Sequence, residues 1–253
     1  MQMKIHHLNC GTMTPPAAPR MVAHCLLLET ARDLVLVDTG FALGEDRLEA
    51  AFLRTARPSL DPAESAVRQL RDLGLDPEDV RHIVLTHLDP DHAGGLRDFP
   101  HARVHVHAAE LAAATRPGGG LAQRRRYLPA QWAHGPDWAP YDDAGEELYG
   151  LRARPLDGVE GVALVPLAGH SRGHSGVAVD TGDGWLLHAG DAYWFHGELS
   201  APSHCPLTLR LAQRLVAVDH TQRLANVARL RELPEQIQVF SAHDAAELTR
   251  YTG

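Results

Sequence analysis

The stretch "THLDPDHAGG" at residues 86–95 constrains the fold of this chain more than any other. Within six consecutive positions it carries four side chains that can bind a metal ion: His87, Asp89, Asp91 and His92. The apolar run "HIVL" stands directly before it and predicts a β-strand over residues 82–87. Since a strand holds the loop at its end rigidly, we expect a metal-binding loop at the carboxyl end of this strand.

Further strands are predicted by apolar and β-branched runs between polar turns. They lie at residues 3–8, 21–30, 34–40, 101–107, 162–170, 175–181, 185–191 and 237–243. Helical periodicity and capping residues predict helices at residues 61–74, 108–115 and 206–233, the last of them divided in two. This alternation of strands and helices is typical of a layered α/β protein.

Residues 116–147 are rich in Gly, Pro and Trp and show no clear period. We expect a long loop insertion here, between two similar halves of the chain, rather than a linker between domains. Because 253 residues fit one large α/β domain, the chain is predicted to be a single domain over residues 1–253.

Three more potential metal ligands follow other predicted strands. His170 ends "LVPLAGH", Asp191 follows "LLHAG", and His243 ends "QVFSAH". With the four in the first stretch, seven possible ligands come from four strand ends, which can converge in space. A catalytic zinc ion typically keeps about three protein ligands. Two ions about 3.5–4 Å apart can share a carboxylate, so seven donors fit two metal ions.

The order of these motifs resembles the metallo-β-lactamase superfamily, whose fold is a four-layer αβ/βα sandwich. The family motif H-x-H-x-D-H corresponds to "HLDPDH" at residues 87–92. The family's paired Gly-His motif, bridging Asp, last His and early Asp correspond to "GHSRGHSG", "HAGDA", "SAHD" and "VDTG". One such motif would be weak evidence, but five in the same order, over roughly residues 20–245, are strong evidence.

The resemblance implies two metal sites that share one carboxylate. The first metal would be bound by His87, Asp89 and His170. The second would be bound by Asp91, His92 and His243. Asp191 would bridge the two ions, and Asp38 and His174 would support the ligands without binding metal themselves. The expected cofactors are two divalent metal ions, zinc first, with manganese or iron as alternatives.

Asp89 departs from the family pattern, which has His at this position. One interpretation is that the site has decayed to a single metal. We favour the other, in which Asp89 is a carboxylate ligand, since every other ligand position is intact and Asp binds zinc at about 2.0–2.2 Å. The exchange adds a negative charge, which should make this metal a weaker Lewis acid and favour manganese or iron somewhat more.

The resemblance predicts a metal-dependent hydrolase in which a hydroxide between the two metals attacks an ester-type carbonyl. Asp91, Asp191 and Tyr193 are the candidate catalytic residues, with Asp91 or a metal-bound water passing a proton to the leaving group. Tyr193 is included because some lactonases of the family have a Tyr near the bridging Asp that touches the substrate. The alternative for Tyr193 is simple packing beside Trp194 and Phe195.

A lactone is the first substrate class that we expect. The stretch "HAGGL…FP" after the metal motif is most similar to the acyl-homoserine-lactonase-like branch of the family, which hydrolyses lactone rings. A glyoxalase-II-like thioesterase remains an alternative. So does a phosphodiester hydrolase, in which Arg124–Arg126 would contact the substrate. A metal-binding protein without hydrolytic activity is a further alternative.

Composition narrows the partners. A net charge of −8 and a pI of about 6.1 disfavour nucleic acid and anionic membranes as partners. The longest apolar runs are too short to span a bilayer, and the first residues lack the apolar core of a signal peptide. Three widely spaced cysteines imply no disulfide framework, so we expect a cytoplasmic protein. The expected partner is a small-molecule substrate, and a homodimer is left open.

Overall fold

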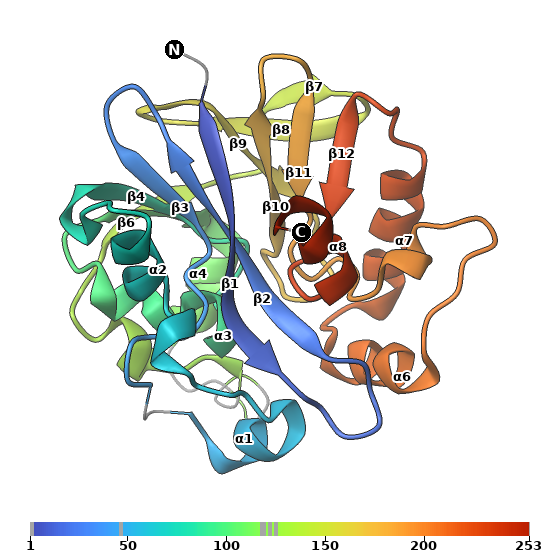
Figure 1. Cartoon of the computed structure of the whole chain (residues 1–253). Coiled ribbons are helices and arrows are strands. Elements are labelled where there is room, and N and C mark those ends of the chain that lie inside the picture. The colour runs from blue at the N-terminus through green and yellow to red at the C-terminus, as the bar shows by residue number, and fades with distance from the viewer. Residues whose placement is uncertain (1–2, 46–47, 117–119, 121–122, 124–125, 253) are drawn as a thin grey trace.

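The computed structural model describes residues 3–45, 48–116, 120, 123 and 126–252. Within these residues two six-stranded β-sheets pack face to face, and helices cover their outer faces (Figure 1). The first sheet has the strand order β1-β2-β3-β4-β5-β6, and the second has the order β12-β11-β10-β9-β8-β7. The predicted four-layer αβ/βα sandwich is thereby confirmed.

The elements have the following bounds. The first sheet consists of β1 (Lys4–Met13), β2 (Met21–Glu29), β3 (Leu34–Val37), β4 (Val80–Val84), β5 (Arg103–His107) and β6 (Asp137–Tyr141). The second consists of β7 (Glu146–Leu148), β8 (Leu151–Leu156), β9 (Val159–Pro166), β10 (Ser175–Asp180), β11 (Trp185–His188) and β12 (Ile237–Phe240). The helices are α1 (Ala50–Ala56), α2 (Ala66–Asp72), α3 (Pro90–Ala93), α4 (Ala108–Thr115), α6 (Leu207–Val216), α7 (His220–Arg231) and α8 (Ala245–Thr252). In the described ranges, no helix combines the length and the apolar character needed to cross a bilayer.

Strand β2 is apolar on both faces because both of its faces are covered. Leu26 and Leu28 belong to the core between the two sheets, where Val177 and Phe240 of the second sheet meet them. The intervening Leu27 belongs to a different cluster, on the outer face of the first sheet. Since side chains alternate between the two faces of a strand, a strand covered on both faces becomes the continuous apolar run "CLLL".

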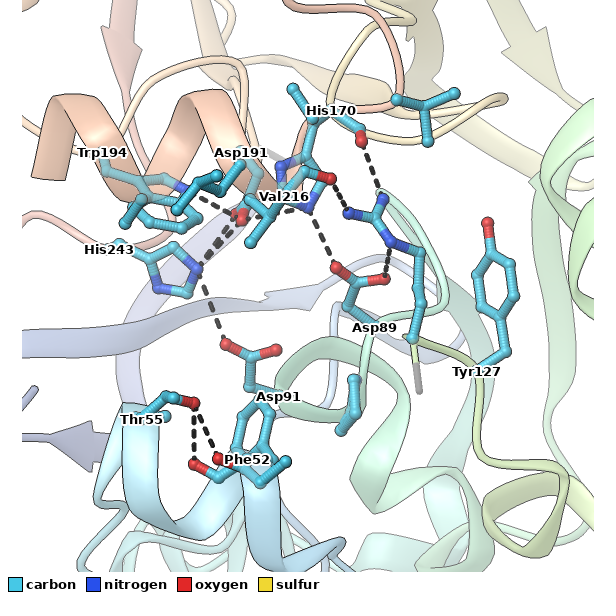
Figure 2. A pocket seen from close by; sticks show the side chains of 18 of the residues that line it. Phe52, Thr55, Asp89, Asp91, Tyr127, His170, Asp191, Trp194, Val216 and His243 are labelled. Atoms are coloured by element: carbon cyan, nitrogen blue, oxygen red, sulfur yellow. Dashed lines mark hydrogen bonds and ion pairs between the residues drawn. The ribbon is translucent and has the colours of Figure 1, made fainter. Parts of the chain in front are cut away.

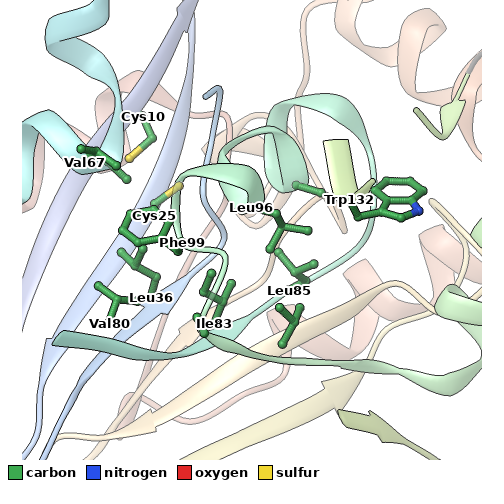
Figure 3. Close-up of a cluster of buried hydrophobic side chains, with 14 of the residues drawn as sticks. Cys10, Cys25, Leu36, Val67, Val80, Ile83, Leu85, Leu96, Phe99 and Trp132 are labelled. Carbon is green, nitrogen blue, oxygen red and sulfur yellow. The ribbon is translucent and has the colours of Figure 1, made fainter. Parts of the chain in front are cut away.

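The outer cluster anchors the strand that carries the first metal-binding loop (Figure 3). Val67 of α2 belongs to this cluster, together with Ile83 of β4 and Leu85, which follows β4. Both Ile83 and Leu85 are fully buried, and burying a side chain of this size contributes about 1.5–3 kcal/mol. The backbone of β4 is therefore held in place up to Leu85, directly before Thr86 and His87.

The strand ends gather the candidate ligands at one edge of the sandwich. Strands β3, β4 and β5 are parallel, so Asp38 after β3 and the loop at residues 87–92 after β4 leave the sheet at the same edge. In the second sheet β11 and β12 are parallel, and they are followed by Asp191 and His243. In this topology, side chains that are far apart in the sequence lie next to one another in space.

The segment at 116–147 differs from the prediction of a long loop insertion. It contains strand β6, which pairs in parallel with β5, a short 3₁₀ helix at Pro129–Trp132 and the start of β7. Strand β6 is an edge strand of the first sheet. Its sequence "DWAPY" includes Pro140, which an edge strand tolerates because one side of its backbone has no strand partner. Because proline normally argues against a strand, the sequence pattern does not predict β6.

Two helical regions also differ from the sequence pattern. The helix predicted at residues 61–74 is a 3₁₀ turn at Pro62–Glu64 followed by α2, whose first turn is capped by the Ser65 hydroxyl, which accepts a hydrogen bond from the Arg68 amide at 3.4 Å. Helix α1 was not predicted. None of its side chains is fully buried, and only Phe52 and Ala56 pack against an apolar cluster, which is too short an apolar stripe to indicate a helix from the sequence.

Candidate metal centre

The predicted ligands converge where strands of the two sheets end. Figure 2 shows five of them, namely Asp89, Asp91, His170, Asp191 and His243. Three groups of side chains have potential ligand atoms that all lie within 4.8 Å of one another. These groups are His87, Asp89 and His170; Asp91, His92 and His243; and His87, His92 and Asp191. All seven residues predicted as ligands therefore belong to one cluster.

The first group is arranged around the carboxylate of Asp89. Asp89 Oδ2 lies 2.9 Å from His170 Nε2 and 3.5 Å from His87 Nε2. His87 comes from the end of the first sheet and His170 from the loop after β9, so this group spans both sheets. We call it the Asp89 group.

The second group lies on the other side of Asp191. His243 Nε2 is 3.6 Å from Asp91 Oδ2, and His92 Nε2 is 4.0 Å from Asp91 Oδ1. We call Asp91, His92 and His243 the Asp91 group. Asp191 faces both groups, since its Oδ1 lies 3.3 Å from His92 Nε2 and its Oδ2 lies 3.5 Å from His170 Nε2.

Four buried atoms in the cluster make no hydrogen bond within the described part of the chain: His87 Nε2, His92 Nε2, Asp89 Oδ1 and Asp191 Oδ1. Asp89 Oδ1 lies 3.5 Å from Arg126 Nε, but the other three belong to the ligand groups, and buried polar atoms are almost always hydrogen-bonded, so these unpaired atoms need an explanation. Imidazole nitrogens and carboxylate oxygens are the donors that zinc and related divalent metals take. The residues present therefore fit a metal centre.

Surrounding groups turn the rings of the Asp91 group toward the centre. Asp38 Oδ2 accepts a hydrogen bond from His92 Nδ1 at 2.8 Å and another from the Thr86 hydroxyl at 2.7 Å. His243 Nδ1 donates to the carbonyl of Val22 at 2.8 Å. In both rings the outer nitrogen is occupied, so Nε2 points inward. Asp38 has a φ of 55°, a strained conformation for a residue other than Gly that aims its carboxylate at these partners.

His174 is close to the cluster but faces away from its centre. Its Nε2 accepts a hydrogen bond from the backbone N–H of Asp191 at 2.8 Å, and its Nδ1 donates to the carbonyl of Leu167 at 2.9 Å. Both ring nitrogens are thus occupied. His174 thus holds the backbone of Asp191 and offers the cluster no free nitrogen.

Opposite charges dominate the pKa values inside the cluster. Burial lowers the pKa of His92, but the carboxylates of Asp191 and Asp38 outweigh burial and hold that pKa well above its usual value. Burial raises the pKa of Asp191, but His243 and His92 outweigh it and hold that pKa well below its usual value. The carboxylate of Asp191 thus stays ionised, which is the form that binds metal.

Glu110 is a functional residue that sequence reasoning missed. This fully buried side chain of α4 accepts hydrogen bonds from the amides of Leu88 at 3.2 Å and Gly173 at 2.9 Å and from the Ser171 hydroxyl at 2.7 Å. It therefore ties the loop of His87 to the loop of His170. The available signal was a lone acidic residue in the alanine-rich helix "AAELAAAT".

The contact between α4 and the loop of His170 requires a glycine. A Cβ atom at Gly173 would lie 2.2 Å from the amide nitrogen of Glu110, which is far inside van der Waals contact. The second glycine of "GHSRGHSG" thus allows the two backbones to approach each other.

The structure places Tyr193 away from the metal cluster. The side chain is fully buried, and its hydroxyl donates to Glu247 at 3.1 Å. The position near Asp191 that was expected for Tyr193 is held by the next residue, Trp194. Trp194 lines the cavity above the cluster, and its indole Nε1 donates to Asp191 Oδ2 at 2.8 Å. The catalytic role predicted for Tyr193 has no support in this geometry.

The cluster forms the floor of a cavity of about 1430 Å³. Helices α1, α4 and α6 contribute to its walls, and much of the wall surface is apolar, with Met21, Phe52, Leu209 and Leu215 among the lining residues. The floor is formed by Asp89, Asp91, His170, Asp191 and His243 (Figure 2). A cavity of this kind suits a substrate with an apolar part and a polar group that reaches the floor.

Of the predicted arginine run, Arg124 and Arg125 lie outside the described residues. The guanidinium of Arg126 lies beside Asp89, with Nε 3.5 Å from Asp89 Oδ1. It also donates to the backbone carbonyl of His170 at 2.7 Å and to that of Val216. Arg126 is therefore held by the protein itself.

Comparisons with known sequences agree with this geometry. The family profile described as the metallo-beta-lactamase superfamily matches residues 18–243. A probable metallo-hydrolase of Mycobacterium tuberculosis is 44% identical over 252 residues, which covers 96% of this chain and 80% of the relative. An N-acyl homoserine lactonase of Bacillus cereus is 27% identical over 246 residues, covering 92% and 86% of the two chains.

Solved structures have the same fold. An N-acyl homoserine lactone hydrolase, with the product N-hexanoyl-L-homoserine bound at its catalytic metal centre, superposes with a TM-score of 0.72. The two chains are 22% identical, and the superposition covers 99% of this chain and 97% of the other. At this identity the likeness establishes the arrangement of the sheets and helices.

Proposed function

The chain belongs to the metallo-beta-lactamase superfamily and is a metal-dependent hydrolase, and from this premise we propose that it hydrolyses an ester-type carbonyl, foremost that of a lactone, at a centre for two divalent metal ions. The observation that carries this proposal is the pair of ligand groups that share Asp191 at the floor of the cavity.

We propose that the Asp89 group holds one ion, that the Asp91 group holds the other, and that Asp191 bridges them. Zinc is the first candidate for both ions, with manganese or iron as alternatives. When bound, such a pair supplies an activated hydroxide and a Lewis acid for a carbonyl oxygen. The chain supplies the rest, namely the placement of the ligands, the shape of the cavity and the movement of protons.

Asp91 and Trp194 have distinct roles in this proposal. Asp91 lines the cavity and is 8% exposed, so its carboxylate can take up a proton and pass it to the departing alkoxide. Trp194 donates to Asp191 and so fixes the orientation of the shared carboxylate. Its ring also walls the site and excludes water from the reacting carbonyl.

The lactone assignment has two supports. The apolar walls offered by Phe52, Leu209 and Leu215 suit the acyl chain of such a substrate. The relatives include an N-acyl homoserine lactonase and a solved hydrolase with the product N-hexanoyl-L-homoserine at its metal centre.

A thioester or phosphodiester with an anionic part is the second candidate. Arg54, Arg116 and Arg172 line the same cavity and could pair with a carboxylate or a phosphate. Arg126 is occupied by Asp89 and two carbonyls, so it is a weaker candidate for that contact than the sequence suggests.

A panel of an acyl-homoserine lactone, an acyl thioester and bis(p-nitrophenyl) phosphate tests the reaction class. We expect the lactone to have the highest kcat/KM, and we expect all turnover to disappear in Asp191→Ala. A higher kcat/KM for the thioester or the phosphodiester would replace the lactone assignment. Turnover that persists in Asp191→Ala would overturn the proposed centre.

A further inference from the structure

Asp89 introduces a third carboxylate into a centre that otherwise pairs Asp91 and Asp191 with four imidazoles. A carboxylate in place of a neutral imidazole adds one negative charge in a buried place. Left unbalanced, that charge would weaken the Lewis acidity of a metal bound beside it. The groups around Asp89 therefore determine whether that added charge is balanced.

The two oxygens of Asp89 face different partners. Oδ2 points to His170 Nε2 at 2.9 Å and toward His87 Nε2 at 3.5 Å, which is the direction of the candidate metal position. Oδ1 points the other way, toward Arg126 Nε at 3.5 Å. One carboxylate thus joins the centre on one side to a guanidinium on the other.

Arg126 is held in place independently of Asp89. Its guanidinium donates to the carbonyls of His170 and Val216, which lie around Asp89 on one side of the cavity (Figure 2). The side chains of Arg126 and Asp89 are only 12% and 15% exposed. A positive charge fixed by backbone acceptors at such low exposure is screened little by solvent.

We infer that Arg126 is a positioning residue that balances the charge of Asp89, so that a carboxylate can replace imidazole as a metal ligand without making the centre more anionic. This inference rests on the proposed function, since it assumes a metal at the Asp89 group. It assigns Arg126 to the ligand Asp89 and away from the substrate.

The pKa of Asp89 agrees with this pairing. Burial raises that pKa, but the positive charge of Arg126, followed by His87, outweighs burial and holds it well below its usual value.

A double-mutant cycle on metal affinity tests the pairing without measuring activity. Zinc is titrated against a chelator in the wild type, Arg126→Met, Asp89→His and the double variant. In the wild-type background, Arg126→Met should loosen one of the two ions by about 10–100-fold. In the Asp89→His background the guanidinium would face the metal with no carboxylate between them, so its removal should leave affinity unchanged or tighten binding.

The controls separate charge balance from a structural role. Arg68→Met removes an arginine from an exposed ion pair with Asp72 at 3.0 Å, and it should leave the affinity for both ions within about twofold of the wild type. Arg126→Lys keeps the charge without the guanidinium's fork of donors and should fall between Arg126→Met and the wild type. If Arg126→Met does not fold, Arg126→Gln, which also removes the charge but keeps a donor for the backbone carbonyls, completes the same cycle.

The outcomes are distinguishable. An equal loss of affinity in both backgrounds, or no loss in either, would overturn the role of Arg126 and leave the proposed centre standing. A wild-type chain that binds no zinc would overturn the proposed function together with this inference.

Discussion

The Asp89 group and the Asp91 group are positioned by different means. In the Asp91 group, His92 donates to Asp38 and His243 donates to the Val22 carbonyl, so both rings are fixed by buried hydrogen bonds. In the Asp89 group, His170 Nδ1 makes no hydrogen bond to any described residue, and Asp89 faces Arg126.

The difference separates two ways of building a metal site. Hydrogen bonds to the outer ring nitrogens fix the direction of a ligand, and a carboxylate acceptor such as Asp38 also raises its basicity. A neighbouring guanidinium changes the charge balance around a ligand and acts over a longer distance. In the Asp91 group both rings are thus fixed through their outer nitrogens, whereas the Asp89 group has one such contact, between His87 Nδ1 and the Thr86 hydroxyl at 3.0 Å, and adds the charge of Arg126.

Removal of the carboxylate shared by both groups should have the largest effect. Asp191→Ala should release both ions and lower kcat/KM by roughly a thousandfold or more, since metal-derived stabilisation of the transition state amounts to several kcal/mol. Elemental analysis of the purified variant together with kinetics measures both effects. Asp191→Asn, which keeps an oxygen for the indole of Trp194, should lose less. Two ions retained per chain in Asp191→Ala would contradict the shared position.

Asp38→Ala should break the Asp91 group selectively. His92 would lose the acceptor that orients it, so we expect one ion to be bound about 10–100-fold more weakly while the other changes much less. Chelator competition, which resolves two binding steps, measures this. Asp33→Ala, in the turn between β2 and β3, is a matched control that should leave both steps unchanged. Equal weakening of both ions would remove the distinction between the groups.

Glu247 supports the segment of the Asp91 group, because it accepts hydrogen bonds from the Ser241 amide at 2.7 Å and from the Tyr193 hydroxyl. Burial raises the pKa of Glu247 from 4.5 to about 7. Between about pH 4.5 and pH 7, Glu247 keeps its proton in the folded chain but has released it in the unfolded chain. The contribution of Glu247 to the free energy of unfolding should therefore fall as the pH rises from about 5 to 8, by on the order of 1–3 kcal/mol.

Denaturant unfolding of the metal-free wild type and of Glu247→Gln at a series of pH values checks this. Gln keeps an acceptor for both partners but does not titrate, so the stability difference between the two proteins should shift with pH in the direction given. A difference that is constant from pH 5 to 8 would contradict the raised pKa.

Substitutions of the adjacent aromatics Trp194 and Tyr193 should have the smallest effects. The first should change kcat, and the second should change stability. Trp194→Phe removes the donor to Asp191 and should lower kcat by roughly three- to tenfold, equivalent to about 1 kcal/mol for one hydrogen bond. Tyr193→Phe removes the hydroxyl that donates to Glu247 and should lower stability by about 0.5–1.5 kcal/mol while kcat stays unchanged. A large loss of kcat in Tyr193→Phe alone would restore the catalytic role that the sequence suggests for it.

The layered fold and the gathering of His87, His170 and His243 could be predicted because each follows a short apolar strand. Such strands are covered on both faces, so their residue pattern is unambiguous. Strand β6 could not be predicted in the same way, because Pro140 interrupts the pattern at the edge of the sheet. Helix α1 could not be predicted either, since none of its side chains is fully buried.

The surroundings of the ligands were harder to predict than the ligands themselves. Whether Tyr193 or Trp194 faces the cavity depends on the turn after Asp191, where one residue more or less reverses the direction of the side chain. Glu110 and Arg126 act on loops far away in the sequence, through hydrogen bonds and an ion pair that no local pattern encodes. Such contacts exist only after the sheets have brought the loops together.

Helix α1 has a consequence for the evolution of this protein. It lines the cavity with Phe52 and Thr55. None of its side chains is fully buried, although Phe52 and Ala56 pack against the apolar cluster that contains Phe41. Substitutions at its exposed positions Arg54 and Thr55 should therefore cost the fold little while they change the cavity wall that a substrate meets. The floor and this wall of the cavity can diversify at different rates, and these exposed positions suit a library aimed at new substrates.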